Sequence, residues 1–135
     1  MKELATYVLK LADGRNEPIK DLDGASRTIL VDEQTVNADE ITFGHSRYEP
    51  RTSVHKKHFH RNAEEIMYIL SGRGLAGVND QETVVASGDT VWVPKGAVHW
   101  FSNPFDEPCE FVFLYTKSSL QKAAYEIVSE MSPDE

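Results

Sequence analysis

The sequence predicts an all-β domain, a small sandwich or barrel of short strands. β-Branched and aromatic residues gather in short runs, and turn residues separate one run from the next. Runs of this length and spacing are typical of β-sandwiches and barrels. The expected strands are Thr28–Val31, Glu40–Tyr48, Ser53–His60, Glu65–Leu70, Gly74–Val78, Glu82–Ala86, Thr90–Pro94, His99–Ser102 and Cys109–Tyr115.

The composition is that of one globular domain: 135 residues, of which 40% are hydrophobic and 27% charged. A formal net charge of −8 argues against nucleic acid and anionic membranes as partners. The first residues lack the apolar run of a signal peptide, and no stretch approaches membrane-spanning length. Cys109 is the single cysteine, so no intramolecular disulfide can form, and the cytoplasm is the expected location.

Three segments are expected within this single domain. Residues 1–37 should add short strands that pack on the barrel, and residues 38–116 should form the barrel. Residues 117–135 differ, because Ser118 and Gln121 have the spacing of a capping box. The apolar residues at helical spacing in this segment are Leu120, Ala123, Ala124, Ile127, Val128 and Met131. A short C-terminal α-helix is therefore predicted, with one face against the barrel or a partner subunit.

Histidines and a glutamate are the candidate ligands of a metal ion. His58 and His60 are two residues apart, so in a strand both imidazoles point to the same face. Glu65 can approach them from the next strand, and a carboxylate in so apolar a strand needs a partner charge, which a metal would supply. A register shifted by one residue would exchange the roles of Glu64 and Glu65.

His99 is the fourth candidate, and it follows a Pro-x-Gly turn at Pro94 and Gly96. Three imidazoles and one carboxylate suit a borderline divalent ion such as Fe, Ni, Mn, Co, Cu or Zn. They do not suit calcium or magnesium, which prefer oxygen ligands. The expected cofactor is one divalent transition-metal ion.

The spacing of these residues resembles the first motif of the cupin superfamily, G-x5-H-x-H-x3,4-E-x6-G. The matching residues are His58, His60, Glu65 and Gly72. The opening glycine of the motif falls on Thr52, so the turn that enters this strand should differ here.

The second cupin motif, G-x5-P-x-G-x2-H-x3-N, is matched at each fixed position. The matching residues are Gly88, Pro94, Gly96, His99 and Asn103. Two motifs in the right order form a more specific signal than either alone. The resemblance covers roughly residues 45–116. It implies a jelly-roll β-barrel of six or eight strands, with the four ligands inside one end and two metal positions left for water, substrate or dioxygen.

The pocket wall is less well defined by the sequence. Aromatic residues on barrel strands belong to the core more often than to a binding site. The candidate substrate contacts are Tyr48, Met67 and Phe113. His45 lies on an alternating set that could be the inner face of its strand, which would make it a core or pocket-rim residue. Arg47 and Arg51 could bind a substrate carboxylate or phosphate, and whether these three residues reach the pocket is left open.

The leading hypothesis for function is a mononuclear metal enzyme acting on a small soluble organic molecule. By resemblance, small cupins include dioxygenases, isomerases, epimerases, decarboxylases and lyases. A dioxygenase-type oxidoreductase is favoured, because the sequence offers no basic cluster for a sugar phosphate and no acid–base pair beyond the ligands. The alternatives are a non-redox isomerase or epimerase, a lyase or decarboxylase, and a metal-dependent binding or sensor module without turnover. The metal could also be purely structural. A homodimer is expected.

Overall fold

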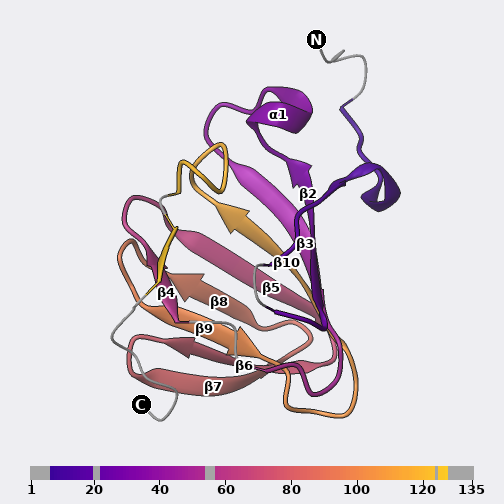
Figure 1. Cartoon of the computed structure of the whole chain (residues 1–135), viewed down its shortest axis with the longest axis vertical. Helices are drawn as coiled ribbons and strands as arrows, with labels where there is room; N and C mark the ends of the chain where they lie inside the picture. The colour runs from indigo at the N-terminus through magenta and orange to yellow at the C-terminus, as the bar shows by residue number, and fades with distance from the viewer. Residues whose placement is uncertain (1–6, 20–21, 54–56, 124, 128–135) are drawn as a thin grey trace.

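The computed structural model describes residues 7–19, 22–53, 57–123 and 125–127. Two antiparallel sheets face each other (Figure 1). One sheet contains, in spatial order, β1 (Arg15–Asn16), β2 (Ala25–Val31), β3 (Thr42–Tyr48), β10 (Cys109–Tyr115), β5 (Glu65–Ser71) and β8 (Thr90–Val93). The other contains β11 (Tyr125–Ile127), β4 (His58–His60), β9 (His99–Ser102), β6 (Arg73–Val78) and β7 (Gln81–Ala86).

The all-β prediction is confirmed, and every expected strand has a counterpart in the structure. The strand expected at Ser53–His60 is described only as β4, because residues 54–56 lie outside the described part of the chain. β2 begins at Ala25 rather than at Thr28. β1 and β11 were not predicted; both are short and pair at the edges of the two sheets.

β10 occupies the middle of the six-stranded sheet, between β3 and β5. Phe113 of β10 is paired with Gly44 of β3 and Met67 of β5. A Cβ atom at Gly44 would collide with the Phe113 ring, so this glycine lets the ring lie across β3. The buried set of β3 is Thr42, Gly44, Ser46 and Tyr48. His45 therefore lies on the other face of β3, which answers the question that the sequence left open.

The predicted C-terminal helix is wrong over the residues described. Ser118 to Ala123 form turns, and Tyr125–Ile127 form β11, which pairs with β4 in an antiparallel manner. A short helix is marginal because its first turn is unfavourable to form. The edge of β4, by contrast, presents unpaired backbone groups that a strand can satisfy. Residues 128–135, which the prediction also covered, lie outside the described part.

Helical structure in the described residues is limited to the 3-10 turn η1 (Leu11–Asp13) and the short helix α1 (Glu33–Val36). The side chain of Asp32 caps α1 by accepting hydrogen bonds from the backbone N–H groups of Gln34 and Thr35. Asp32 also accepts a hydrogen bond from Arg15 at 2.8 Å. No helix in these described ranges is long and apolar enough to cross a membrane.

Candidate metal centre

β4 supplies two histidines to the space between the sheets. His58 and His60 are each 3% exposed, and Phe59 between them faces the other side of the strand. This alternation is the consequence of the two-residue spacing seen in the sequence. The backbone of Ala123 lies near the His60 ring and favours its protonated form.

His99 reaches the same place from β9, where it is paired with His58. The preceding turn is held against β4, because the backbone N–H of Gly96 donates to the His60 carbonyl at 2.9 Å. Gly96 has a φ of +79°, a conformation that glycine adopts without strain. The His99 Nδ1 atom lies 3.1 Å from the Ala97 carbonyl, which can only accept a hydrogen bond. Nδ1 therefore carries the hydrogen, and Nε2 is left with a lone pair for a metal.

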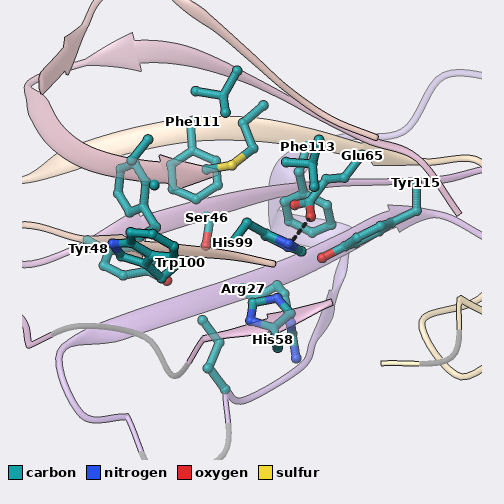
Figure 2. Close-up of a pocket in the computed structure, with 17 residues that line it drawn as sticks. Arg27, Ser46, Tyr48, His58, Glu65, His99, Trp100, Phe111, Phe113 and Tyr115 are labelled. Atoms are coloured by element: carbon teal, nitrogen blue, oxygen red, sulfur yellow. Dashed lines mark ion pairs between the residues drawn. The ribbon is translucent and has the colours of Figure 1, made fainter. Parts of the chain in front are cut away.

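Glu65 approaches the histidines from the opposite sheet. Its Oε1 atom lies 3.0 Å from His99 Nε2 and 3.8 Å from His60 Nε2. Figure 2 shows the Glu65–His99 contact as a dashed line, with the Tyr115 hydroxyl pointing toward the same region. Glu64 points away, and its carboxylate accepts a hydrogen bond from the exposed Trp92 indole at 2.8 Å. Glu65, and not Glu64, therefore faces the histidines.

The environment sets the charges of the cluster. Burial opposes ionisation of Glu65, but the neighbouring histidines and a hydrogen bond from Tyr115 outweigh it and lower the pKa of this carboxyl group. Burial lowers the pKa of His60 to about 4. For His99 burial acts in the same direction, yet the adjacent Glu65 carboxylate raises its pKa. The carboxylate is thus ionised at neutral pH and His60 is neutral, the forms in which both groups bind metals.

The donor atoms fit a transition-metal ion. The ligand nitrogens of His58, His60 and His99 all lie within 4.8 Å of one another. Glu65 Oε1 and His99 Nε2 are buried and make no hydrogen bond, although they are 3.0 Å apart. Buried polar atoms in native proteins are almost always hydrogen-bonded, so this ion pair without hydrogen-bond geometry fits a metal ion as the partner of both atoms. Three imidazoles and a carboxylate suit the divalent ions expected from the sequence.

A cavity of about 40 Å³ adjoins these ligands. Tyr48, Met67 and Phe113 line it, at the positions proposed from the sequence, and all three are at most 5% exposed. Their contact with a substrate remains a prediction. Val91 and Val93 of β8 extend the apolar wall. The wall would exclude bulk water and strengthen electrostatic interactions inside.

Arg27, Ser46 and Tyr115 also line the cavity. Arg27 was not predicted as a site residue, although its alternation with the apolar residue Ile29 in β2 points it to the same face. Burial and the Glu65 carboxylate raise the pKa of Tyr115 well above its usual value. The positive charge of Arg27 acts against this rise.

Three other candidates do not line the cavity. His45 Nε2 lies 2.8 Å from Glu110, and Arg47 pairs with Glu49 and Glu110. Arg51 pairs with Asp106. These groups face carboxylates outside the cavity, so the pocket roles considered for them are not supported by their positions.

A two-sheet antiparallel barrel with three histidines and a glutamate converging inside one end defines a cupin-type barrel with a candidate metal centre. The family model for the cupin domain (Cupin_2) matches residues 44–115, which are more than half of the chain. The chain belongs to this family.

Curated relatives share only part of their length with this chain. The uncharacterized protein MJ1618 of Methanocaldococcus jannaschii is 36% identical over 62 residues, 46% of this chain and 47% of the relative. The tetracenomycin polyketide synthase protein TcmJ of Streptomyces glaucescens is 27% identical over 90 residues, 67% of this chain and 60% of the relative. The chain therefore spans about half to three fifths of the length of the curated relatives it matches.

Solved structures share the fold at low identity. The polyketide cyclase RemF of Streptomyces resistomycificus superimposes with a TM-score of 0.75 at 19% identity, covering 96% of this chain and 89% of RemF. A protein of Thermotoga maritima described as a predicted oxalate decarboxylase gives a TM-score of 0.71 at 21% identity, covering 82% and 98%. At such identities the likeness establishes the fold alone.

Proposed function

We propose that this protein is a mononuclear metal enzyme whose ion is held by His58, His60, Glu65 and His99. The observation that carries the proposal is the pair of buried atoms Glu65 Oε1 and His99 Nε2, which face each other without a hydrogen bond. Within the chain these atoms form an ion pair at 3.0 Å without hydrogen-bond geometry, whereas a purely structural cluster would complete the hydrogen bond. Their position beside a cavity favours a ligand set that also serves a substrate.

The residues around the cluster have separate tasks in this proposal. The Ala97 carbonyl fixes the tautomer of His99, and the Tyr115 hydroxyl orients the Glu65 carboxylate through its hydrogen bond. Met67, Phe113 and the β8 valines exclude water. A bound divalent ion would supply Lewis acidity toward an enol, hydroxyl or carboxylate, or electron transfer to dioxygen.

A dioxygenase-type reaction on a small organic molecule remains the favoured chemistry. Among the described residues that line the cavity there is no lysine and no acidic group besides Glu65. An isomerase or lyase that moves protons between carbon atoms needs a separate acid or base near the substrate. A largely apolar wall suits a reaction with dioxygen, for which bulk water must be kept away.

A redox-neutral reaction is the second candidate, and one feature of the site favours it. The Tyr115 hydroxyl lies beside Glu65 on the cavity wall and is held in its protonated form by burial, so it could donate a proton to a substrate oxygen. The relationship to TcmJ and the fold shared with a polyketide cyclase agree with such chemistry. A cavity of about 40 Å³ is too small for a multi-ring substrate unless the wall moves.

The test uses metal-free protein reconstituted with Fe(II) under anaerobic conditions. Oxygen uptake and products are measured with a panel of diketones, catechols and thiols, with Glu65→Gln as the matched inactive control. Oxygen consumption coupled to product supports the dioxygenase, and product without oxygen consumption supports the redox-neutral enzyme. Tight ligand binding without turnover with Fe, Mn, Ni, Co, Cu or Zn would instead indicate a binding or sensor module.

A structural role for the metal predicts a different result for His99→Ala. If the ion only stabilises the fold, His99→Ala should unfold, and metal-loaded wild type should turn over no substrate. If the ion is catalytic, the variant should stay folded, bind metal poorly and lose activity.

We also propose that two copies of the chain pair through the outer face of β5 and β8. Ile66, Tyr68, Leu70 and Trp92 are between 40% and 58% exposed, and Ile66 is the strand partner of Trp92. An exposed apolar patch of this kind is typical of an interaction surface. Sedimentation of wild type and of Trp92→Glu tests the proposal, since the charge should dissociate such a dimer.

A further inference from the structure

Arg27 forms part of the cavity wall of the metal centre. In β2 it has the same parity as Ile29, which is fully buried. It is paired across the sheet with Ser46, and Ser46 is paired with Phe111. All three residues line the cavity, as Figure 2 shows for the labelled side chains. The alternation of β2 therefore turns a cation toward the interior.

No carboxylate neutralises Arg27 in the described part of the chain. Four other arginines form ion pairs with carboxylates, namely Arg15, Arg47, Arg51 and Arg61. Arg27 instead donates from Nε to the Glu17 carbonyl at 3.3 Å and from Nη2 to the Pro18 carbonyl at 3.2 Å. These neutral acceptors fix the guanidinium without neutralising it, and among the residues that the structure describes three of its five N–H donors find no partner.

The charge balance of the cavity favours an anion. Arg27 is the single lysine or arginine, and Glu65 the single acidic residue, among the described residues that line the cavity. A divalent ion adds two positive charges, so the ion and the wall together carry an excess of two. Most of the remaining wall is apolar, and a low local dielectric strengthens the attraction of this excess for an anion.

We propose that Arg27 is the anion-binding residue of this site, and that the substrate class is a small organic acid. In this arrangement Arg27 would hold the carboxylate, and an oxygen atom on the adjacent carbon would face the residues proposed to hold the metal. Acids with a 2-hydroxy or 2-oxo group have this arrangement of oxygen atoms. The second half of this inference rests on the proposed metal enzyme, whereas the first half depends only on Arg27.

The site suits a carboxylate better than a phosphate. A guanidinium binds a planar carboxylate through two parallel N–H···O bonds. A phosphate monoester carries more charge and three terminal oxygen atoms, and one arginine on an otherwise apolar wall does not supply enough donors for them. The cavity of about 40 Å³ holds roughly three water-sized spheres, which fits the compact head of a small acid.

The test compares a charged probe with a neutral one of the same size. Co(II)-loaded protein is titrated with glycolate and, separately, with ethylene glycol, and binding is followed by the visible absorption of the cobalt ion. We expect Arg27→Gln to weaken glycolate binding by about 10- to 100-fold, the contribution of a charge-assisted pair. The affinity for Co(II) and for ethylene glycol should stay within about threefold.

Two further variants separate charge from position. Arg27→Lys keeps the charge but loses the planar fork, so its glycolate affinity should fall between those of wild type and Arg27→Gln. Arg73→Gln is the matched control, because Arg73 stacks on the Phe105 ring and does not line the cavity. Arg73→Gln should bind glycolate like wild type.

A metal-free arm keeps this inference separate from the proposed function. Glycolate should shift the Nε–Hε NMR signal of Arg27 in metal-free wild type, with a dissociation constant in the millimolar range. A protein that binds none of the metals sinks the proposed enzyme, but a shift of this signal still supports the anion site. Glycolate affinity unchanged by Arg27→Gln, or no shift of the Arg27 signal, overturns the inference. Should Arg27→Gln fail to fold, Arg27→Lys and the NMR signal decide the question.

Discussion

The two ends of β9 carry buried polar side chains that differ in their hydrogen bonding. At one end every polar atom is hydrogen-bonded, and at the other end some are not. Asn103, just beyond the end of β9, is fully buried. Its Nδ2 group donates to the carbonyls of Tyr48 and Glu49 at 3.1 Å each and of Glu107 at 2.8 Å. Its Oδ1 atom accepts a hydrogen bond from the backbone N–H of Phe105 at 3.0 Å. The chain thus uses every polar atom of this side chain.

At the other end of β9, His99 and Glu65 leave buried polar atoms without a hydrogen bond. His99 and Asn103 belong to the same sequence motif, so the motif alone does not tell a structural residue from a ligand-binding one. Hydrogen-bond satisfaction does, because a buried atom left unbonded destabilises the fold unless something else binds it. Asn103 should therefore contribute to stability and the His99 cluster to binding.

The largest effect is expected for Asn103→Ala. The substitution removes the amide that bonds three carbonyl groups and one N–H group, so unfolding should become easier by about 3 kcal/mol. Urea denaturation of metal-free protein measures this change. Asn62→Ala, at an exposed turn, is the control and should change stability by less than about 0.5 kcal/mol.

The contrast between the two ends is sharpened by Glu65→Gln. This substitution keeps the shape of the side chain and removes a buried charge, so the stability of metal-free protein should change by less than about 1 kcal/mol. Metal affinity should fall by more than about 100-fold, since even the loss of a group that only orients a ligand costs 10- to 100-fold. A large loss of metal-free stability in Glu65→Gln, or of metal affinity in folded Asn103→Ala, would contradict the assignment of stability to one end of β9 and metal binding to the other.

Metal addition should stabilise the wild type only through the His99 end of β9, where buried polar atoms lack a hydrogen bond. At a free metal concentration 100 times Kd, mass action adds about 2.7 kcal/mol, which raises the midpoint of thermal unfolding by roughly 10 °C. Differential scanning calorimetry with and without a chelator measures the shift. In Asn103→Ala, metal should raise the lower unfolding midpoint by the same number of degrees. In Glu65→Gln, metal should not raise the midpoint.

The sequence predicted the local features of this molecule well. The side-chain alternation of His58-Phe59-His60, the turn before His99 and the motif spacing identified the four residues that converge between the sheets. These features depend on residues close together in the chain or on a motif, and a sequence displays both directly.

Features set by pairing between distant segments were not predicted. The insertion of β10 between β3 and β5 fixes which face of β3 is buried, and the spacing within β3 left this undetermined. The residues after Ser118 have a helical pattern, but the open edge of β4 makes a strand more favourable there. Arg27 looks like a polar residue at a strand end until its pairing with Ser46 places it at the cavity.

Thr52 stands where the first motif has glycine, and the structure shows how the turn is built without it. The left-handed conformation falls on Arg51, with a φ of +60°. Thr52 is buried, and its hydroxyl donates toward the carbonyls of Glu49 at 2.6 Å and Gly24 at 3.2 Å.

Thr52→Gly would remove these contacts and add backbone freedom in the unfolded chain, so stability should fall by about 1–2 kcal/mol. Thr52 pairs with Asn103, at the end of β9 whose polar atoms are all hydrogen-bonded, so metal affinity should not change. Urea denaturation and metal titration of the same preparation measure both quantities. Equal stability of the two proteins would mean that glycine serves this turn as well.

The smallest effect is expected at Asp32, a buried polar group that differs from Asn103 in that it can titrate. Burial raises its pKa, but the hydrogen bond and charge of Arg15 and the backbone N–H groups of α1 outweigh burial, so the pKa of Asp32 is lowered in the folded protein. A group with a lowered folded pKa contributes its stability above its unfolded pKa, near 3.9, and loses it as the pH falls through the folded value.

Asp32→Asn keeps a residue that can cap α1 and removes the ion pair with Arg15, so at pH 7 it should be less stable than wild type by about 1 kcal/mol. The difference should persist down to about pH 4 and shrink toward zero below it, because wild-type Asp32 then becomes neutral as well. Urea denaturation of both proteins from pH 7 to pH 2.5 measures the difference. The corresponding difference for Asn103→Ala should stay constant, since an amide does not titrate, and a constant difference for Asp32→Asn would show that the ion pair contributes nothing.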